Sequence, residues 1–485
     1  MNDDHNDENL TEKNTGSLAI WLIAYPLIIT NATNTIMQFV DRKFLAMHST
    51  EEVSAALPGG VLSFLMFTFF LITVGFTAAI VAQNFGKKNF LNCARVPWAG
   101  FYFSLIAGII CSYLLIPAGV FFIHLGKHPP DLQMRELEYF KIMMTSGGFI
   151  FISTAFSAFF SGRGKTWIIV CIQLIANSVN IILDYCLIFG YGGFPEMGIS
   201  GAALATVIAS AVAASIAFSF FIFQNQKKFP TRNDWFFRFD DLKRLLKFGA
   251  PSGIEVAFSV SGFTFLIFLI GRMGTVQLAA STIVFSINML VFMPLLSTSE
   301  AVGILTGKVI GAGNPQLASK IPYKALRFII FYIIFVAIVY FFFSQYIVAF
   351  FSPNNGGGNE FAAVAALGGQ ILIIMSVGNF FDAIKFMFLG ALRGAGDTTA
   401  SMFILIGTSW CILIPGSFLI VEILHFDIIY LWLFIISYAA LNSFFIWLRF
   451  KVGAWKKINM FQEFDTLTEQ NIISAIDNDA ESPHL

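Results

Sequence analysis

Twelve long apolar stretches run through the sequence and constrain its fold more than any other feature. A helix needs about 20 mostly apolar residues to cross the hydrocarbon core of a bilayer. Inside that core the protein must satisfy every backbone N–H and C=O group itself, which favours helices. The sequence therefore predicts an all-α polytopic membrane protein with twelve transmembrane helices. The predicted spans are Leu18–Leu45, Val53–Ala82, Val96–Ile123, Tyr139–Phe160, Trp167–Phe189, Ile199–Phe223, Leu245–Ile270, Val276–Ile310, Ala325–Phe351, Phe361–Leu392, Ser401–Val421 and Ile428–Phe450.

The scarcity of charged residues supports the same class. Only 12% of the 485 residues are charged, which is half the share of roughly 25% found in soluble domains. Lys and Arg number 29, and Asp and Glu also number 29, so no net positive field is available to attract nucleic acid. We expect the lipid bilayer as a partner, no nucleic-acid partner, no cofactor and a monomeric protein.

A polar connector near the middle of the chain divides the spans into two sets of six. Most basic residues fall on the same side as this connector, and such positively charged connections stay in the cytoplasm. We therefore expect a multi-pass protein of the plasma (bacterial inner) membrane with both termini in the cytoplasm. The predicted regions are a disordered acidic tail (1–16), an N-lobe of helices 1–6 (17–225), a cytoplasmic linker (226–242), a C-lobe of helices 7–12 (243–454) and a cytoplasmic C-terminal tail (455–485).

The two lobes carry matching sequence positions. One group of matches pairs Ser161–Thr166 with Arg393–Thr398 at an offset of 232 residues, and a group of single positions, given below, has a slightly shorter offset. Because each repeat has an even number of spans, the repeats run parallel and their pseudo-two-fold axis lies along the membrane normal. This arrangement is typical of transporters whose substrate pathway runs between two lobes. Four pairs recur at an offset of 225 residues: Pro26/Pro251, Ala55/Ala280, Gly86/Gly311 and Asn89/Asn314.

Polar side chains line one face of the first span and one face of the fifth. Their spacings of three and four residues place each set on a single helical face. Two such faces of amide and carboxylate oxygens suit a small hard cation such as Na⁺, or a shared proton. The alternative is a hydrogen-bonded seam between the helices. The faces consist of Asn31, Asn34, Gln38 and Asp41 in the first span, and of Gln173, Asn177, Asn180 and Asp184 in the fifth.

The second lobe does not repeat these polar faces. It has other carboxylates inside its spans, Glu255, Glu300 and Asp382, and each of them needs a partner, a bound ion or water. Lys385 lies on the same helical face as Asp382, so a local ion pair is the alternative there. Glu300 lies nearer the inner end of its span, where we expect it simply to reach water. The residues that replace the fifth-span face at the 232-residue offset are Leu405, Ser409, Ile412 and Gly416.

Pro26 lies inside the first span, where it removes one backbone hydrogen bond and can kink the helix. A kink below the polar face that ends at Asp41 would couple the occupancy of an ion site to helix bending. A static kink without such a role is the alternative, and the sequence alone does not separate the two.

Six short motifs follow one another along the chain: Val40–Asp41, Gln83–Gly86, Asn180–Asp184, Leu187–Gly190, Gly198–Thr206 and Leu392–Thr398. In this order, with twelve spans and a central basic linker, they resemble the multidrug and toxic compound extrusion (MATE) family. The resemblance covers nearly all of Leu18–Ala454. It implies an antiporter that exports amphipathic organic cations and drugs by alternating access, with H⁺ or Na⁺ as the coupling ion.

The resemblance also implies functional residues. In the family's N-lobe cation site, which would hold H⁺ or Na⁺, the matching positions are Asp41, Asn180, Asp184 and Thr206, with the backbone carbonyl of Ala202. Asn34, Gln38, Gln173 and Asn177 would support this site, and Pro26 would mark the kink of the first helix. In the NorM-like branch acidic residues of the second lobe matter, and the matching positions are Glu255 and Asp382. The DinF-like branch usually lacks those acids. This chain has both sets, which leaves the coupling ion open.

Two other functions remain to be weighed against export of organic cations. A flippase of a lipid-linked or anionic substrate, from the same superfamily, would need basic residues in its central cavity. Only Lys141 and Lys385 are clear cations within the spans, against five carboxylates. A membrane-embedded enzyme is not expected, because the spans contain no arrangement typical of a metal centre or a nucleophilic dyad.

Overall fold

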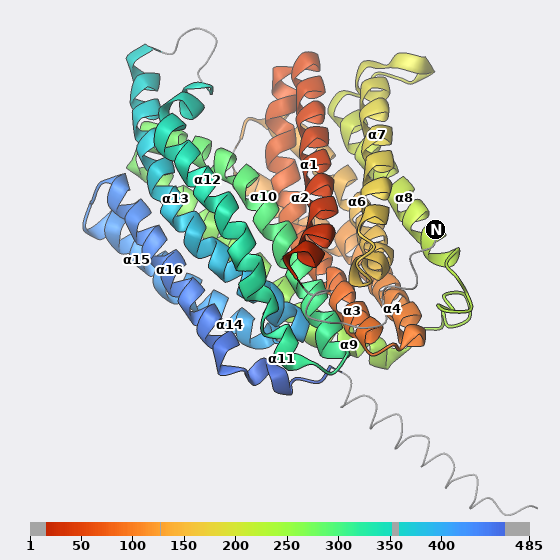
Figure 1. The fold of residues 1–485 in the computed structure, drawn as a ribbon. Coiled ribbons are helices and arrows are strands. Elements are labelled where there is room, and N and C mark those ends of the chain that lie inside the picture. The colour runs from red at the N-terminus through yellow and green to blue at the C-terminus, as the bar shows by residue number, and fades with distance from the viewer. Residues whose placement is uncertain (1–15, 127, 352–357, 461–485) are drawn as a thin grey trace, which may run out of the picture.

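Twelve helices are long and apolar enough to cross a membrane in the computed structural model of the protein (Figure 1). The structure describes residues 16–126, 128–351 and 358–460. Within these residues no strand is present. The first half contains α1 (Ser17–His48), α2 (Thr50–Gly75), α3 (Thr77–Gly86), α4 (Phe90–Ile109), α5 (Ile116–Leu125), α6 (Pro130–Gly162), α7 (Trp167–Phe189) and α8 (Gly198–Ile222). The second half contains α9 (Phe239–Met273), α10 (Thr275–Gly311), α11 (Pro315–Ala318), α12 (Ile321–Ala349), α13 (Gly358–Ala395), α14 (Thr398–Thr408), α15 (Ile414–Phe418) and α16 (Ile428–Val452). The prediction of twelve spans is confirmed.

Several predicted spans contain local irregularities, and proline explains two of them. π-helical turns at Ile110–Leu114 and Ser409–Leu413 end three residues before Pro117 and two residues before Pro415, respectively. Proline lacks an N–H donor, and its ring pushes back the preceding turn, so the hydrogen-bonding pattern widens locally. The second predicted span is divided into α2 and α3 at Phe76. Pro26, in contrast, lies within the continuous helix α1.

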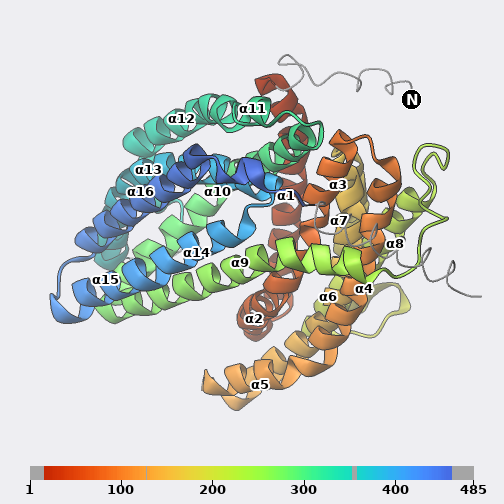
Figure 2. The same ribbon diagram turned by 90° about the horizontal axis from the view of Figure 1, so that it is seen from below.

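Each set of six spans packs around one central helix. In the N-lobe (α1–α8), α6 contacts α2, α4 and α8, whereas α1 pairs with α7. In the C-lobe (α9–α16), α13 contacts α10, α12 and α16. These central helices are the fourth span of each repeat, so equivalent helices hold equivalent positions. Figures 1 and 2 show the two lobes side by side, and the fold class is that of two parallel six-helix repeats.

The lobes meet most closely at the end of the bundle that carries the connection between α8 and α9, here called the linker end (lower in Figure 1). α3 crosses α10 there. A Cβ atom on Gly86 would lie 1.9 Å from the carbonyl oxygen of Lys308, and one on Gly311 would lie 2.0 Å from that of Gln83. The Gln83 amide also donates to the carbonyl of Gly394 at 2.9 Å. The repeat-related glycines thus let one lobe's backbone touch the other's.

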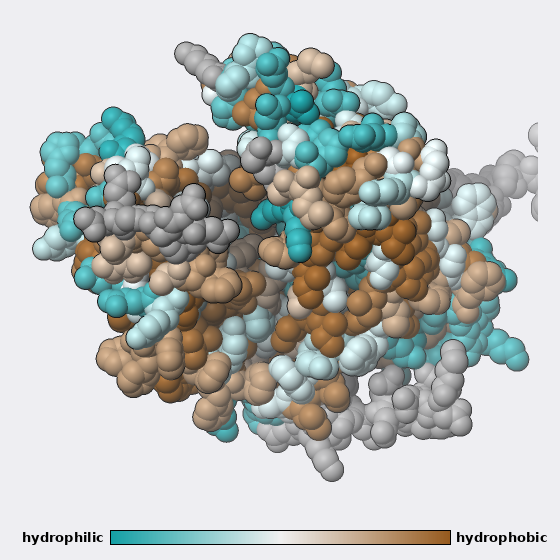
Figure 3. Space-filling view, turned by 90° about the horizontal axis from the view of Figure 1, so that it is seen from above, coloured by the Kyte–Doolittle hydropathy of each residue, from teal (hydrophilic) through white to brown (hydrophobic). Residues whose placement is uncertain are grey.

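The opposite end of the bundle is more open. Figure 3 looks down on this end and shows a recess between the C-lobe, on the left, and the N-lobe, on the right. Brown, apolar side chains surround much of it. The structure therefore has its lobes in contact at the linker end and separated at the other.

The polar connection between the lobes packs against α4 rather than hanging free. Trp98 donates its indole N–H to the carbonyl of Thr231 at 3.0 Å, Arg95 pairs with Asp234 at 3.0 Å, and Phe229 is buried. The predicted linker, 226–242, overlaps α9 in its last residues, since α9 begins at Phe239.

The first residues of the predicted C-terminal tail also pack onto the C-lobe. Trp455 is buried and stacks on Phe450 with ring centroids 4.9 Å apart, and Met460 is buried against Gly396. The boundary predicted at 454 therefore falls inside a packed segment. Predicted disorder over 1–16 concerns residues that, apart from Gly16, lie outside the described part of the chain.

Gly86→Ala is expected to destabilise the protein, because the added methyl group would meet the rigid backbone of α10. Overpacking of this kind costs about 1–3 kcal/mol. Thermal unfolding of the detergent-solubilised protein measures the effect. Gly75→Ala is the matched control, since a Cβ there would meet nothing within 4 Å. Equal melting temperatures for the two variants would contradict the proposed role of the crossing.

Candidate functional site

The carboxylates of α1 and α7 come together inside the N-lobe. With the Asn180 amide oriented to satisfy both of its polar atoms, its nitrogen donates to Asp41 Oδ1 at 3.1 Å and to Asp184 Oδ2 at 3.2 Å. The carboxyl groups of Asp41 and Asp184 are also within hydrogen-bonding reach of each other. Asn180 and Asp184 are fully buried, and Asp41 is half-buried. The predicted pairing of the two polar faces is therefore present.

Thr206 and Ala202 of α8 complete this cluster. The Asn180 oxygen accepts from the backbone N–H of Thr206 at 3.3 Å, and the Thr206 hydroxyl donates to the carbonyl of Ala202 at 3.1 Å. Three helices thus converge on one point. The sequence had placed all of these residues in one site, and the structure brings them together.

The remaining polar residues of the two faces continue the contact between α1 and α7. Asn177 donates to Asn34 Oδ1 at 2.9 Å. This part of the interface is therefore a hydrogen-bonded seam between the two helices, the alternative to an ion site. Gln38 is exposed and Gln173 is half-buried, and they lie on the same two helices. Asn31 turns away from α7 and donates to Ser297 of the other lobe at 3.0 Å.

Tyr139 of α6 is a member of the site that sequence reasoning missed. It packs against a small apolar cluster that includes Leu45 and Ala202, and it interacts electrostatically with Asp41 and Asp184. The spacing within the first and fifth spans could not have revealed it, because it comes from a third helix, α6, whose residues Asp131, Arg135 and Glu138 line a neighbouring polar cavity.

The cluster has the donor set for a proton or a small hard cation. Two carboxyl groups held by one amide donor repel each other when both are charged, so a proton or a cation stabilises the pair. Asp184 Oδ1 is buried and has no hydrogen-bond partner within the described part of the chain, so one acceptor is left for a bound ion. Carboxylate, amide and carbonyl oxygens are the ligands that hard cations prefer. No group of three or more His, Cys, Asp or Glu side chains with metal-binding geometry occurs among the described residues.

Two of the C-lobe carboxylates, Glu255 and Asp382, are in a different situation, because each is paired with a basic side chain. Asp382 forms an ion pair with Lys385 on the same helix, as the alternative for Asp382 predicted. Glu255 forms an ion pair with Arg393 of α13, which the sequence analysis did not foresee. Lys385 also interacts electrostatically with Glu255, so the two pairs are neighbours. The charges of Glu255 and Asp382 are therefore compensated inside the C-lobe.

The C-lobe counterpart of the fifth-span face is neutral. Ser409, which matches Asn177 at the 232-residue offset, is hydrogen-bonded to the Tyr438 hydroxyl at 2.7 Å. Asn442 donates to the same hydroxyl at 3.1 Å and lies 3.4 Å from the Thr408 hydroxyl. This network has no ionisable carboxylate, which confirms that the two lobes differ at equivalent positions.

A polar cavity of about 310 Å³ lies in the N-lobe at the end away from the linker. Next to it, His48 contacts Glu52 at 2.7 Å and Glu196 at 2.9 Å through its two ring nitrogens. His48 follows Asp41 by seven residues on α1, so the cavity lies two helical turns from the carboxylate cluster. Its lining residues are Glu52, Asp131, Met134, Arg135, Glu138, Met197, Ile199 and Ser200.

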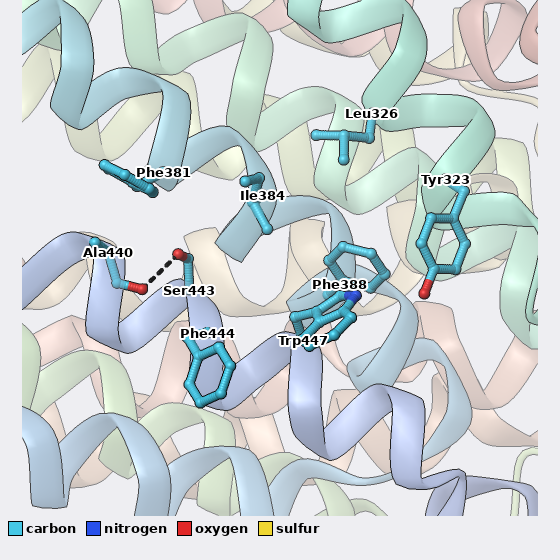
Figure 4. A pocket seen from close by; sticks show the side chains of 9 residues that line it. All are labelled: Tyr323, Leu326, Phe381, Ile384, Phe388, Ala440, Ser443, Phe444 and Trp447. Atoms are coloured by element: carbon cyan, nitrogen blue, oxygen red, sulfur yellow. Dashed lines mark hydrogen bonds between the residues drawn. The ribbon is translucent and has the colours of Figure 1, made fainter.

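A second cavity, of about 300 Å³, lies entirely within the C-lobe between α12, α13 and α16 (Figure 4). Aromatic and aliphatic side chains line it, and the Ser443 hydroxyl donates a hydrogen bond to the carbonyl of Ala440 at 2.8 Å. It carries no charge and does not lie between the lobes. Its lining residues are Tyr323, Leu326, Phe381, Ile384, Phe388, Ala440, Ser443, Phe444 and Trp447.

A family model and curated proteins match most of the chain. The MatE family model matches residues 26–186 and 251–419, and these two matches start 225 residues apart, the offset of the internal repeat. A protein of Thermotoga maritima named "Probable multidrug resistance protein NorM" is 25% identical over 437 residues, which cover 90% of this chain and 92% of the relative. A protein of the same name from Oceanobacillus iheyensis is 26% identical over 450 residues, covering 89% and 92%.

Solved structures share the architecture. A MOP superfamily transporter from Pyrococcus furiosus, described as having a binding pocket of reversed polarity that suggests a different function, superposes with a TM-score of 0.81 at 19% identity, covering 91% of this chain and 97% of that one. An outward-facing multidrug resistance MATE family transporter superposes with a TM-score of 0.80 at 19% identity, covering 91% and 97%. At this identity the likeness concerns the fold.

Arg393→Ala is expected to destabilise the protein, because it would leave Glu255 buried without its counter-charge. Breaking a buried pair in this way costs about 3–5 kcal/mol. Adding Glu255→Gln to Arg393→Ala should restore much of the lost thermal stability. The control is Arg272→Ala, which breaks the Arg272–Glu422 pair, whose arginine is 65% exposed; a surface pair contributes about 0–1 kcal/mol. Equal losses for Arg393→Ala and Arg272→Ala would refute this account of the C-lobe.

Proposed function

The chain belongs to the MatE family of membrane transporters, since the family model covers both of its repeats, and from this premise we propose that it exports amphipathic organic cations, including drugs, in exchange for H⁺ or Na⁺. The curated relatives named as multidrug resistance proteins support this substrate class. The single observation that carries the coupling part is the cluster of Asp41, Asn180 and Asp184. It joins the fully buried Asp184 to the half-buried Asp41 through one amide, and in the described residues neither carboxyl group forms a salt bridge, although the charge of Arg42 acts on Asp41.

The proposed membrane orientation follows the distribution of basic residues. Both termini and the linker end lie in the cytoplasm, and the protein is a multi-pass protein of the bacterial inner membrane. In this orientation the crossing of α3 and α10 closes the cytoplasmic side, and the recess between the lobes faces outward. An ion from outside would reach the N-lobe cluster by way of the polar cavity near His48.

Binding of the ion neutralises the carboxyl pair and so changes what holds α1 against α7. α1 also contacts the C-lobe, because Asn31 is hydrogen-bonded to Ser297 of α10. A change in the position of α1 would therefore reach the contact between the lobes. Pro26 lies between Asn31 and the linker end and is the place at which α1 can bend. This link would make substrate release depend on ion binding.

The ion gradient supplies enough energy for this exchange. One charge that moves through 100 mV yields about 2.3 kcal/mol. Since about 1.4 kcal/mol corresponds to a tenfold ratio, one charge supports a concentration ratio of roughly 50-fold. Exchange of one monovalent ion for one monovalent cation is electroneutral, so in that case the chemical gradient of the ion would drive export.

Efflux of ethidium from proteoliposomes tests the proposal, with a sodium gradient and a pH gradient each imposed alone. Wild-type protein is expected to export ethidium under at least one of them, and the responding gradient identifies the coupling ion. Asp184→Asn should lower coupled efflux at least tenfold, because the pair can no longer bind and release the ion. Glu422→Gln, at an ion pair whose arginine is exposed and which lies outside the N-lobe cluster, is the control and should retain full efflux. Full coupled efflux by Asp184→Asn would refute the site assignment.

A further inference from the structure

α10 faces the N-lobe at three successive points along its length. Ser297 accepts a hydrogen bond from Asn31 of α1 at 3.0 Å. Glu300 accepts one from the Ser161 hydroxyl of α6 at 3.2 Å, and Lys308 donates to the carbonyl of Arg163 at 2.7 Å. Glu300 therefore lies on the seam between the two lobes, in the region where a substrate pathway would run.

The side chain of Glu300 meets open space on this seam. Glu300 is exposed, whereas its helical neighbours Ser299 and Ala301 are buried. Leu296, one turn earlier on the same face of α10, is 40% exposed. A carboxylate and an apolar side chain thus face the same space from adjacent turns.

Glu300 also differs from the other two C-lobe carboxylates in its charge balance. Glu255 is paired with Arg393, and Asp382 is paired with Lys385. Glu300 has only the Ser161 hydroxyl, since no basic side chain forms an ion pair with it within the described part of the chain. A cation that bound at Glu255 or Asp382 would have to displace an arginine or a lysine, whereas one at Glu300 would not. A carboxylate within a membrane span that lacks a counter-charge is stabilised by a cation that enters its space.

We propose that Glu300 is the anionic anchor for the exported organic cation, and that Leu296 provides part of the apolar surface for the rest of the substrate. The inference rests on the proposed export of organic cations and assigns the substrate charge to a different residue from the ion-coupling pair in the N-lobe. It differs from the expectation from sequence that Glu300 simply reaches water. The ligand is a monovalent cation with an apolar body, because such a molecule matches one carboxylate beside an apolar side chain.

The position of Glu300 on the seam also links substrate binding to the contact between the two lobes at the linker end. Its hydrogen-bond partner belongs to the N-lobe, so separation of the lobes at the linker end would remove that bond. The Asn31–Ser297 contact lies one helical turn away on α10 and connects Glu300 to α1. The carboxyl pair in the N-lobe and the anchor in the C-lobe are therefore joined through two helices, α1 and α10.

Equilibrium binding to the purified full-length protein in nanodiscs tests the anchor. Two probes that share a triphenylphosphorus body are compared, tetraphenylphosphonium, a permanent cation, and neutral triphenylphosphine oxide, each in competition with ethidium followed by fluorescence anisotropy. Wild-type protein should prefer the cation at least tenfold. Glu300→Gln should lose this preference and bind ethidium at least tenfold more weakly, whereas Glu300→Asp, which keeps the charge, should retain most of it.

Two controls separate the anchor from general effects on the fold. Glu422→Gln removes a carboxylate from the Arg272–Glu422 pair, whose arginine is exposed, and should bind like wild type. Ser161→Ala removes the hydrogen bond to Glu300 and keeps the charge, so it should preserve the preference for the cation. If Glu300→Gln melts more than 10 °C below wild type, Glu300→Ser replaces it as the neutral variant and must lose the preference, whereas Glu300→Asp must keep it.

The outcomes for the anchor and for the proposed function are distinguishable. Wild-type protein that binds and exports ethidium, together with a Glu300→Gln variant that keeps the full preference for tetraphenylphosphonium, would overturn the anchor and leave the proposed function intact. Wild-type protein that neither binds nor exports any cation would overturn both.

Discussion

The crossing of α3 and α10 is the contact on which the arrangement of the two lobes depends. Gly86 lies against the backbone of α10, and Gly311 lies against the backbone of α3, so each repeat contributes the same residue to the same junction. Backbone that packs on backbone has no side chain that can yield, and closely packed interfaces tend to have discrete arrangements. The lobes are therefore expected either to meet fully at the linker end or to separate there. In the structure they meet, and the recess lies at the other end (Figure 3).

Charge compensation divides the interior of the protein into two kinds of region. In the C-lobe, Glu255 and Asp382 are held by Arg393 and Lys385, so that region is neutral overall. In the N-lobe, the carboxyl groups of Asp41 and Asp184 have an amide between them. Removing a charge from water costs several kcal/mol even after the protein relaxes. A group that lacks a counter-charge is therefore the place where a mobile proton or ion has the largest effect on stability, which is why the N-lobe cluster suits coupling.

Two helices connect the parts that a transporter must couple. α1 carries Asp41 at one end and Asn31 in its middle, and Asn31 contacts α10 of the other lobe. α10 carries Glu300 and takes part in the crossing at the linker end. A displacement of α1 would therefore act directly on the seam through α10, which packs against both α1 and the central helix α13. Coupling through a shared helix needs two discrete positions of that helix, and Pro26 provides a place where it can bend.

The number and order of the spanning helices were determined by the sequence alone, because the bilayer leaves a long apolar segment no alternative to a helix. The pairing of Asp41 with Asn180 and Asp184 was likewise predictable, since spacings of three and four residues place polar groups on one face of each helix. Contacts between distant helices were not predictable. Arg393 lies 138 residues from Glu255, and Tyr139 comes from α6, outside the two helices whose polar faces meet. Only the tertiary structure decided which carboxylates were neutralised and which one, Glu300, was left facing open space on the seam, because burial and ion pairing depend on distances that no local periodicity encodes.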